Sequence, residues 1–167
     1  MHMSEQWAKH RYLDASALVK IVVDEGDHDA VRSFFVANFN LGATSLCVME
    51  ALGVLKGKWT HRRISDDIYF GATRQPVRYV SGRKIEVEDI DLFTYQGLDA
   101  VQARAKKHHL DLSDALQLET ILRDTYSHLG PNSASVLITA DAGLATAAAA
   151  EGVRVWNCIK EAQPSWA

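Results

Sequence analysis

The fold is decided by residues 11–20, Arg11-Tyr12-Leu13-Asp14-Ala15-Ser16-Ala17-Leu18-Val19-Lys20, where a short apolar strand runs into a carboxylate and then into a helix. Tyr12 and Leu13 suit a buried strand and the residues after Asp14 are mostly helix formers, so the change of structure falls at Asp14. In an open parallel sheet this junction is the carboxyl end of a strand, where ligands and catalytic groups gather. An isolated Asp or Ser at such a junction can instead serve only as a helix cap. The other acids of the chain decide between these interpretations.

The chain has 167 residues, of which 47% are hydrophobic. This length predicts one domain over residues 1–167, with its core at about 11–156. The sequence shows neither a basic segment followed by an apolar run nor an apolar stretch long enough for a bilayer, so we expect a cytoplasmic protein that does not associate with membranes. Cys47 and Cys158 lie far apart, and we expect both to be buried as small hydrophobic side chains.

The formal net charge of −3 gives no overall sign of nucleic-acid binding. A cluster of acids at a metal site would, however, hide local basic patches in that total. Basic residues do gather locally, and each group by itself is more often a solvated surface than a phosphate site. These groups are Lys56, Lys58, His61-Arg62-Arg63, Arg74, Arg78, Arg83-Lys84, Arg104 and Lys106-Lys107-His108-His109.

Strands and helices are expected to alternate along the chain. The first expected strand ends at Leu13. The other four cover residues 41–44, 84–88, 135–139 and 153–156. Between them we expect helices from Asp27 or Asp29 to Ala37, from Thr44 or Ser45 to about Trp59, over 61–75 with a break at Gln75-Pro76, over 92–109, from Asp111 onward, and over 144–150, with a loop at Gly130-Pro131-Asn132. Parallel neighbours need crossover helices, so this alternation predicts an α/β fold whose parallel sheet is covered by helices on both faces.

Glu50 is the one charged residue in an otherwise apolar or glycine stretch from Leu46 to Leu55. Helical spacing places Glu50 beside Met49 and Val54, on a face that we expect to be buried. A lone ionised carboxylate is costly there unless it has a partner or a metal ion. The alternative is a Glu at the helix edge that reaches solvent or pairs with an Arg.

Four acids are expected to meet at one edge of the sheet. Asp14 and Asp141 each follow a strand, and Glu50 and Asp114 lie in the first turns of helices. Right-handed crossovers bring such positions to the same edge. Two carboxylates about 4 Å apart repel by about 4 kcal/mol at an effective dielectric of 20, and a divalent cation removes this repulsion. Because the set contains only oxygen ligands, it favours Mg²⁺ or Mn²⁺ over zinc.

These segments resemble the successive motifs of PIN-domain ribonucleases, and most of all those of the VapC-type toxins of bacterial toxin–antitoxin pairs. The resemblance covers about Arg11 to Trp156, with a longer middle segment, roughly Ile64 to Lys84, than compact family members have. The matching segments are Tyr12-Leu13-Asp14-Ala15-Ser16-Ala17-Leu18, Thr44-Ser45 with Glu50, Ser113-Asp114-Ala115-Leu116, and Leu137-Ile138-Thr139-Ala140-Asp141.

The resemblance implies a PIN-like three-layer fold with a five-stranded parallel sheet in the order 3-2-1-4-5. It implies that Asp14, Glu50, Asp114 and Asp141 bind Mg²⁺, for which Mn²⁺ can substitute, with Ser16 and Thr139 as polar support. The implied reaction is hydrolysis of RNA phosphodiester bonds. The implied partners are an RNA substrate, an antitoxin protein and a second copy of the chain.

Several other functions fit the sequence less well. A haloacid-dehalogenase-type phosphatase would need a second acid where Ser16 stands, and a response-regulator receiver would need a phosphoacceptor Asp after a central strand and a late Lys. Dinucleotide binding lacks its glycine motif, and serine catalysis lacks its nucleophile elbow. A PIN-like module that binds RNA or protein without catalysis stays open, as does a PIN nuclease with a housekeeping role in RNA processing.

Overall fold

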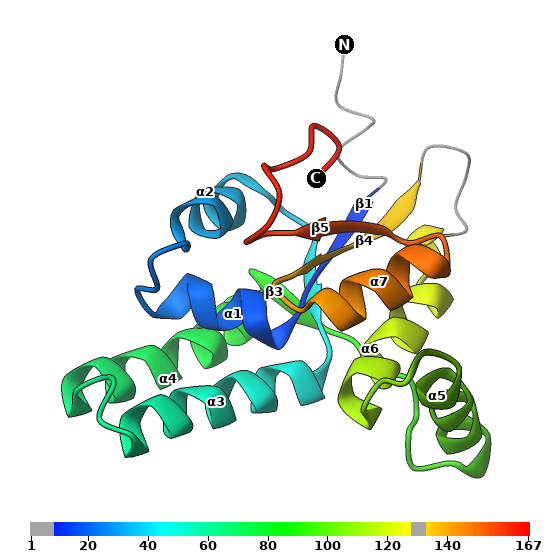
Figure 1. Ribbon diagram of the computed structural model, residues 1–167, viewed down its shortest axis with the longest axis horizontal. Coiled ribbons are helices and arrows are strands. Elements are labelled where there is room, and N and C mark those ends of the chain that lie inside the picture. The colour runs from blue at the N-terminus through cyan, green and yellow to red at the C-terminus, as the bar shows by residue number, and fades with distance from the viewer. Residues whose placement is uncertain (1–8, 128–132) are drawn as a thin grey trace.

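A five-stranded parallel sheet forms the centre of the protein, as a computed structural model of the chain shows (Figure 1). The structure describes residues 9–127 and 133–167, and the expected loop Gly130-Pro131-Asn132 lies outside them. The strands follow the order β3-β2-β1-β4-β5, and every neighbouring pair is parallel. The α/β class and the strand order 3-2-1-4-5 are therefore confirmed.

The strands are short and the helices carry most of the chain. The strands are β1 (Lys9–Leu13), β2 (Leu41–Ala43), β3 (Ile85–Val87), β4 (Ala134–Thr139) and β5 (Arg154–Asn157). The helices are α1 (Ala15–Val22), α2 (Asp29–Ala37), α3 (Ser45–Thr60), α4 (Asp66–Ser81), α5 (Tyr95–His108), α6 (Leu112–Arg123) and α7 (Ala142–Ala150).

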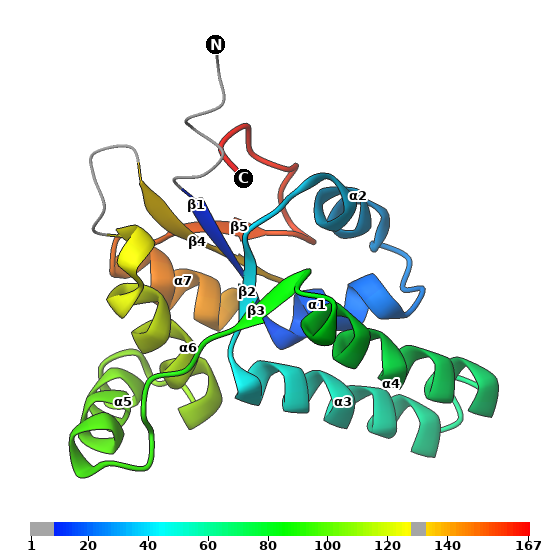
Figure 2. The same cartoon turned by 180° about the vertical axis from the view of Figure 1, so that it is seen from behind.

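Helices cover both faces of the sheet, and Figure 2 shows the arrangement from behind. Successive residues of a strand point to opposite faces. Leu13 and Ile138 accordingly belong to the core beneath α1 to α4, while Tyr12 and Leu137 belong to the core beneath α6 and α7. Helix α5 packs against α6. The result is the expected three-layer arrangement.

The middle of the chain differs from the expectation. Instead of a helix over 61–75 that breaks at Pro76, helix α3 ends at Thr60 and α4 begins at Asp66, after Ser65 caps it. Helix α4 then continues through Pro76 to Ser81. A proline inside a helix removes one hydrogen bond and costs about 3 kcal/mol. Pro76 is buried in α4, and this packing offsets the cost in a way that local propensity does not show.

Helices α3 and α4 form a long antiparallel hairpin that projects beyond the sheet (Figure 1). The longer middle segment of the chain is mainly this second helix. Among the residues that the structure describes, none of the helices is both long and apolar enough to cross a membrane. Cys47 and Cys158 are buried and unpaired, as expected.

Candidate metal centre

Asp14 lies at the end of β1 and caps α1. The peptide nitrogen of Asp14 donates to the carbonyl of Ile138, which ties the end of β1 to β4. Its Oδ1 accepts from the peptide nitrogen of Ala15 at 2.7 Å, and its Oδ2 accepts from the Ser16 hydroxyl at 2.5 Å and from the Thr139 hydroxyl at 2.8 Å. Asp14 is therefore a helix cap, as its position alone allowed. Because Oδ1 accepts fewer of these bonds than Oδ2, one lone pair of Oδ1 is available to a further ligand.

Ser16 and Thr139 hold the ends of β1 and β4 together. Besides donating to Asp14, the Ser16 hydroxyl accepts from the peptide nitrogen of Ala140, and the Thr139 hydroxyl accepts from that of Asp141, each at 2.8 Å. The two hydroxyls therefore fix Asp14 and position the chain that carries Asp141.

Glu50 comes from α3 and is held by the start of α6. Its Oε2 accepts from the Ser113 hydroxyl at 2.9 Å, which leaves Oε1 for another partner. The expectation that Glu50 lies on a buried face is wrong. Glu50, Met49 and Val54 are exposed, because this side of α3 faces the cleft and solvent while Cys47, Ala51 and Leu55 face the core.

Asp114 and Asp141 complete the set from α6 and from the end of β4. Asp111 caps α6 by accepting from the peptide nitrogen of Asp114 at 2.9 Å. The Oδ1 of Asp141 caps α7 by accepting from the peptide nitrogen of Leu144 at 2.7 Å. Both caps place the carboxylates at helix N-termini, where backbone N–H groups favour negative charge.

All four predicted acids line one cleft of about 330 Å³. Burial in this cleft and repulsion between the acids both show in the pKa values. Burial, followed by the charges of Asp14, Asp111, Asp141 and Glu50, raises the pKa of Asp114 to about 7. Burial also raises the pKa of Asp14, against the opposing effect of its hydrogen bonds from Ser16 and Thr139. Although Glu50 is exposed as a whole, partial desolvation of its carboxylate in the cleft raises its pKa, followed by the neighbouring acids and against the hydrogen bond from Ser113.

The donor set fits a hard, hydrated cation. Among the described residues, no three of these carboxylates bring oxygens within 4.8 Å of one another. Mg²⁺ keeps several waters and usually takes only one or two carboxylates directly. Asp14 would supply a direct ligand through Oδ1, and waters would bridge the wider gaps to the other acids. Each carboxylate also offers the oxygen ligands that Mn²⁺ accepts.

Basic residues also line the cleft, and the sequence analysis did not assign them to the site. Lys20 of α1 and Lys58 of α3 lie there together with Glu25. A signal for them exists in the helical spacing, because Lys20 follows Ser16 by four residues and Lys58 follows Glu50 by eight. Asp111, expected only as a cap, also lines the cleft and contributes negative charge.

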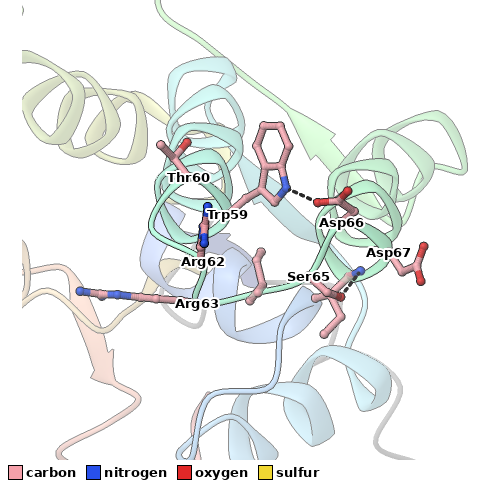
Figure 3. Close-up of a pocket in the computed structure, with 9 residues that line it drawn as sticks. Trp59, Thr60, Arg62, Arg63, Ser65, Asp66 and Asp67 are labelled. Carbon is pink, nitrogen blue, oxygen red and sulfur yellow. Dashed lines mark hydrogen bonds between the residues drawn. The ribbon is translucent and has the colours of Figure 1, made fainter.

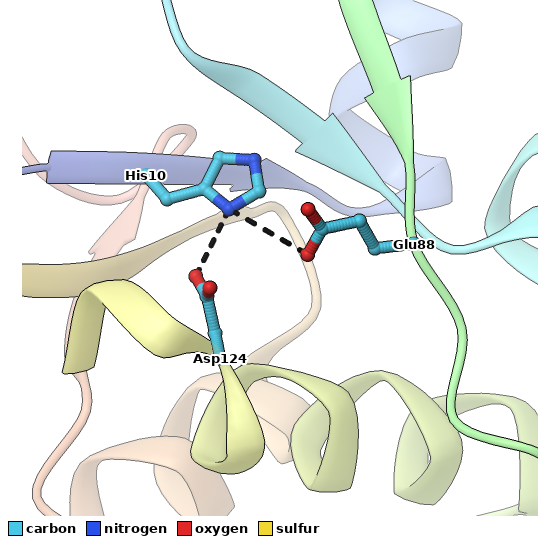
Figure 4. A group of neighbouring side chains, drawn as sticks. All are labelled: His10, Glu88 and Asp124. Carbon is cyan, nitrogen blue, oxygen red and sulfur yellow. Dashed lines mark hydrogen bonds and ion pairs between the residues drawn. The ribbon is translucent and has the colours of Figure 1, made fainter. Parts of the chain in front are cut away.

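A second group of metal-ligand types brings together His10 of β1, Glu88 just after β3 and Asp124 just after α6. His10 Nδ1 is 2.9 Å from Asp124 Oδ2 and 3.9 Å from Glu88 Oε2 (Figure 4). Both oxygens already accept hydrogen bonds, from Ser135 and from Tyr12. A histidine that binds metal through one nitrogen normally donates its other N–H to a partner. His10 Nε2 is buried and has no partner among the described residues, so we interpret the group as a structural hydrogen-bond network.

Comparison with known proteins establishes the fold and nothing finer. No family model matches the chain, and no curated protein matches it significantly. A solved structure, that of PAE2754 from Pyrobaculum aerophilum, is similar with a TM-score of 0.60 and 22% sequence identity. The similarity covers 90% of this chain and 91% of that one. At this identity, the match supports a shared α/β architecture over nearly the full length of both chains.

Proposed function

We propose that this protein is a Mg²⁺- or Mn²⁺-dependent endoribonuclease of the PIN type that hydrolyses RNA phosphodiester bonds. One observation carries the proposal. Asp14, Glu50, Asp114 and Asp141 come from four separate segments and line the same cleft, where burial and then the neighbouring charges raise the pKa of Asp114 to about 7. Such a strongly shifted carboxyl in a cleft is typical of functional sites.

Each acid has its own part in the reaction. When bound, the divalent cation supplies Lewis-acid stabilisation of the phosphate and lowers the pKa of a coordinated water. Asp14 would hold the cation through Oδ1, and Asp114 and Asp141 would hold it directly or through waters. Glu50 would orient the attacking water through Oε1, because Oε2 accepts from the Ser113 hydroxyl. Ser16 and Thr139 keep Asp14 in place.

The resemblance of the four motifs to those of VapC-type toxins supports a biological role as the toxin of a toxin–antitoxin pair in the cytoplasm. A freely active ribonuclease needs restraint, and a separate antitoxin would provide it by covering the acidic cleft. We expect such a partner to present an Arg or Lys to the carboxylates and an amphipathic helix to apolar surface. Met49 and Val54, exposed on α3, offer part of that surface. The family resemblance also suggests a homodimer.

The proposal is tested with purified protein and a labelled single-stranded RNA. We expect cleavage with Mg²⁺ or Mn²⁺ and none in excess chelator. Asp14→Asn keeps the shape of the side chain but removes its charge, and we expect it to lower the cleavage rate by about a hundredfold or more. Asp99→Asn is the matched control, because Asp99 is exposed on α5 and does not line the cleft.

Cleavage at the wild-type rate in excess chelator would refute the metal role, and so would an unchanged rate in Asp14→Asn. RNA that binds but is not cleaved under any of these metal conditions would favour a non-catalytic binding module.

A further inference from the structure

Helix α3 runs from the acidic cleft toward basic side chains near its C-terminal end. Glu50, Val54 and Lys58 recur every four residues and all line the cleft, so they share one side of the helix. Arg62 and Arg63 follow just after the helix ends at Thr60, and both are exposed. Eight residues at 1.5 Å each place Lys58 about 12 Å from Glu50 along the axis, and the turn lies about 18 Å away.

Lys58 already has an ion-pair partner, Glu25, in the folded protein. It donates to Glu25 Oε1, while Lys20 lies 3.1 Å from the other carboxylate oxygen of Glu25 and 2.5 Å from Asp27. Burial raises the pKa of Glu25, but the hydrogen bonds from Lys58 and Lys20 outweigh this effect and lower it overall. Glu25 thus stays ionised and neutralises cations that otherwise face the cleft.

A larger hollow opens at the far end of α3. The turn between α3 and α4 borders a cavity of about 880 Å³ whose lining includes Arg62, Arg63 and Trp59 (Figure 3). The ring of Trp59 stacks on that of Tyr69, with the centroids 4.6 Å apart, so it forms a fixed wall. Its indole nitrogen donates to Asp66 at 2.8 Å. In Figure 3 the side chain of Arg63 extends away from the α4 acids.

We propose that the side of α3 that carries Glu50, Val54 and Lys58 is a phosphate-binding track for single-stranded RNA, and that it continues to Arg62 and Arg63 in the turn beyond the helix. This inference rests on the proposed nuclease function and names residues that hold its substrate outside the reacting centre. Four acids alone would repel RNA, and cations spaced along one helix supply the complementary charge. At about 3.4 Å per stacked nucleotide, the 18 Å from Glu50 to the turn corresponds to roughly five nucleotides.

Glu25 would regulate RNA binding by competing with RNA phosphates for Lys58. An RNA phosphate that reaches Lys58 replaces the carboxylate of Glu25 as its partner. Removing the charge of Glu25 therefore frees Lys58 and Lys20, and should tighten RNA binding although it breaks ion pairs of the folded protein. A residue with only a structural role would not have this effect.

The test is fluorescence anisotropy with a labelled ten-nucleotide single-stranded RNA, in excess chelator and from 50 to 300 mM salt. Each phosphate contact contributes about 0.7 to the slope of log affinity against log salt for single strands. We expect Lys58→Gln to reduce the slope by about 0.7 and the double change Arg62→Gln with Arg63→Gln to reduce it by about 1.4. Lys56→Gln is the control, because Lys56 lies about 160° from Lys58 around the helix and does not line the cleft.

We expect Glu25→Gln to bind more tightly than wild type at low salt, by about threefold or more. Thermal melting of each variant confirms that it is folded. The track is overturned if Lys58→Gln and the double arginine variant bind like Lys56→Gln, or if wild type does not bind RNA at 50 mM salt. Either result would favour a protein, rather than RNA, as the partner of the α3–α4 surface.

These outcomes separate the track from the nuclease. Cleavage with Mg²⁺ combined with unchanged salt slopes rejects the track and retains the nuclease. Reduced slopes in an RNA-binding protein that never cleaves support the track and reject the nuclease.

Discussion

Burial and the neighbouring acids raise the pKa of Asp114. Its pKa of about 7 in the folded protein exceeds the value of about 3.9 for an exposed Asp. Between these values the folded state binds more protons than the unfolded state, so without metal the free energy of unfolding should fall as pH rises from about 4 to about 7. The effect is moderated by partial exposure of the side chain.

Urea unfolding in excess chelator at pH 5, 6, 7 and 8 measures this dependence. We expect Asp114→Asn to show a flatter profile than wild type, because it removes the titrating group. Asp99→Asn should keep the wild-type profile. Identical profiles for wild type and Asp114→Asn would show that burial and the neighbouring acids do not raise the pKa of Asp114.

The sequence predicted that some residues would meet in the cleft, and it did not predict others that line it. Asp14 and Asp141 follow strands in a parallel sheet, so their shared edge follows from topology alone. The sequence did not predict that Lys20, Glu25 and Lys58 line the cleft. Their contacts depend on how α1 and α3 pack, and no single segment of the sequence encodes this packing. The exposure of Glu50 was misjudged for a related reason, since apolar neighbours along a helix do not show which side faces a cleft.

At the scale of elements, Gly97 fixes how α5 begins. A Cβ at this position would come within 1.8 Å of the Asp91 carbonyl oxygen and 3.0 Å of the Thr94 hydroxyl, which caps the helix. The backbone before α5 would have to move, so we expect Gly97→Ala to lower the free energy of unfolding by about 1 to 3 kcal/mol or more.

Gly71→Ala is the matched control, since Gly71 is an exposed residue of α4 whose added Cβ would meet nothing within 4 Å. We expect it to raise the free energy of unfolding by up to about 1 kcal/mol through helix propensity. Urea midpoints compare the two variants. Equal effects would mean that α5 does not begin as described.

The elements were predictable where pattern and topology agree. Strand β4 and helix α7 follow from an apolar run, a capping Asp and an alanine-rich stretch, and β3 follows from its alternation. Helix α4 was not predictable, because Pro76 argues locally for a break and only burial against the rest of the fold keeps the helix intact. Local rules therefore failed in the α3–α4 hairpin, where tertiary packing decides the structure.

At the scale of the whole molecule, the proposed toxin function predicts that the acids of the cleft are needed to arrest bacterial growth. If the protein cleaves essential RNA, expressing it alone in bacteria should arrest growth. Asp114→Asn should relieve the arrest without lowering the amount of soluble protein, because it removes a charge proposed to bind the metal while Asp111 still caps α6. Growth curves and soluble-protein blots measure both quantities.

Asp99→Asn should arrest growth like wild type, because this exposed acid lies outside the cleft. Arrest that persists in Asp114→Asn would point to a binding function, since no bond cleavage is then required. Normal growth with abundant soluble wild-type protein would reject the toxin role while leaving the metal chemistry to the cleavage assay. The cell assay therefore tests what the cleft does to RNA in the cell, and the purified protein tests whether the cleft can act at all.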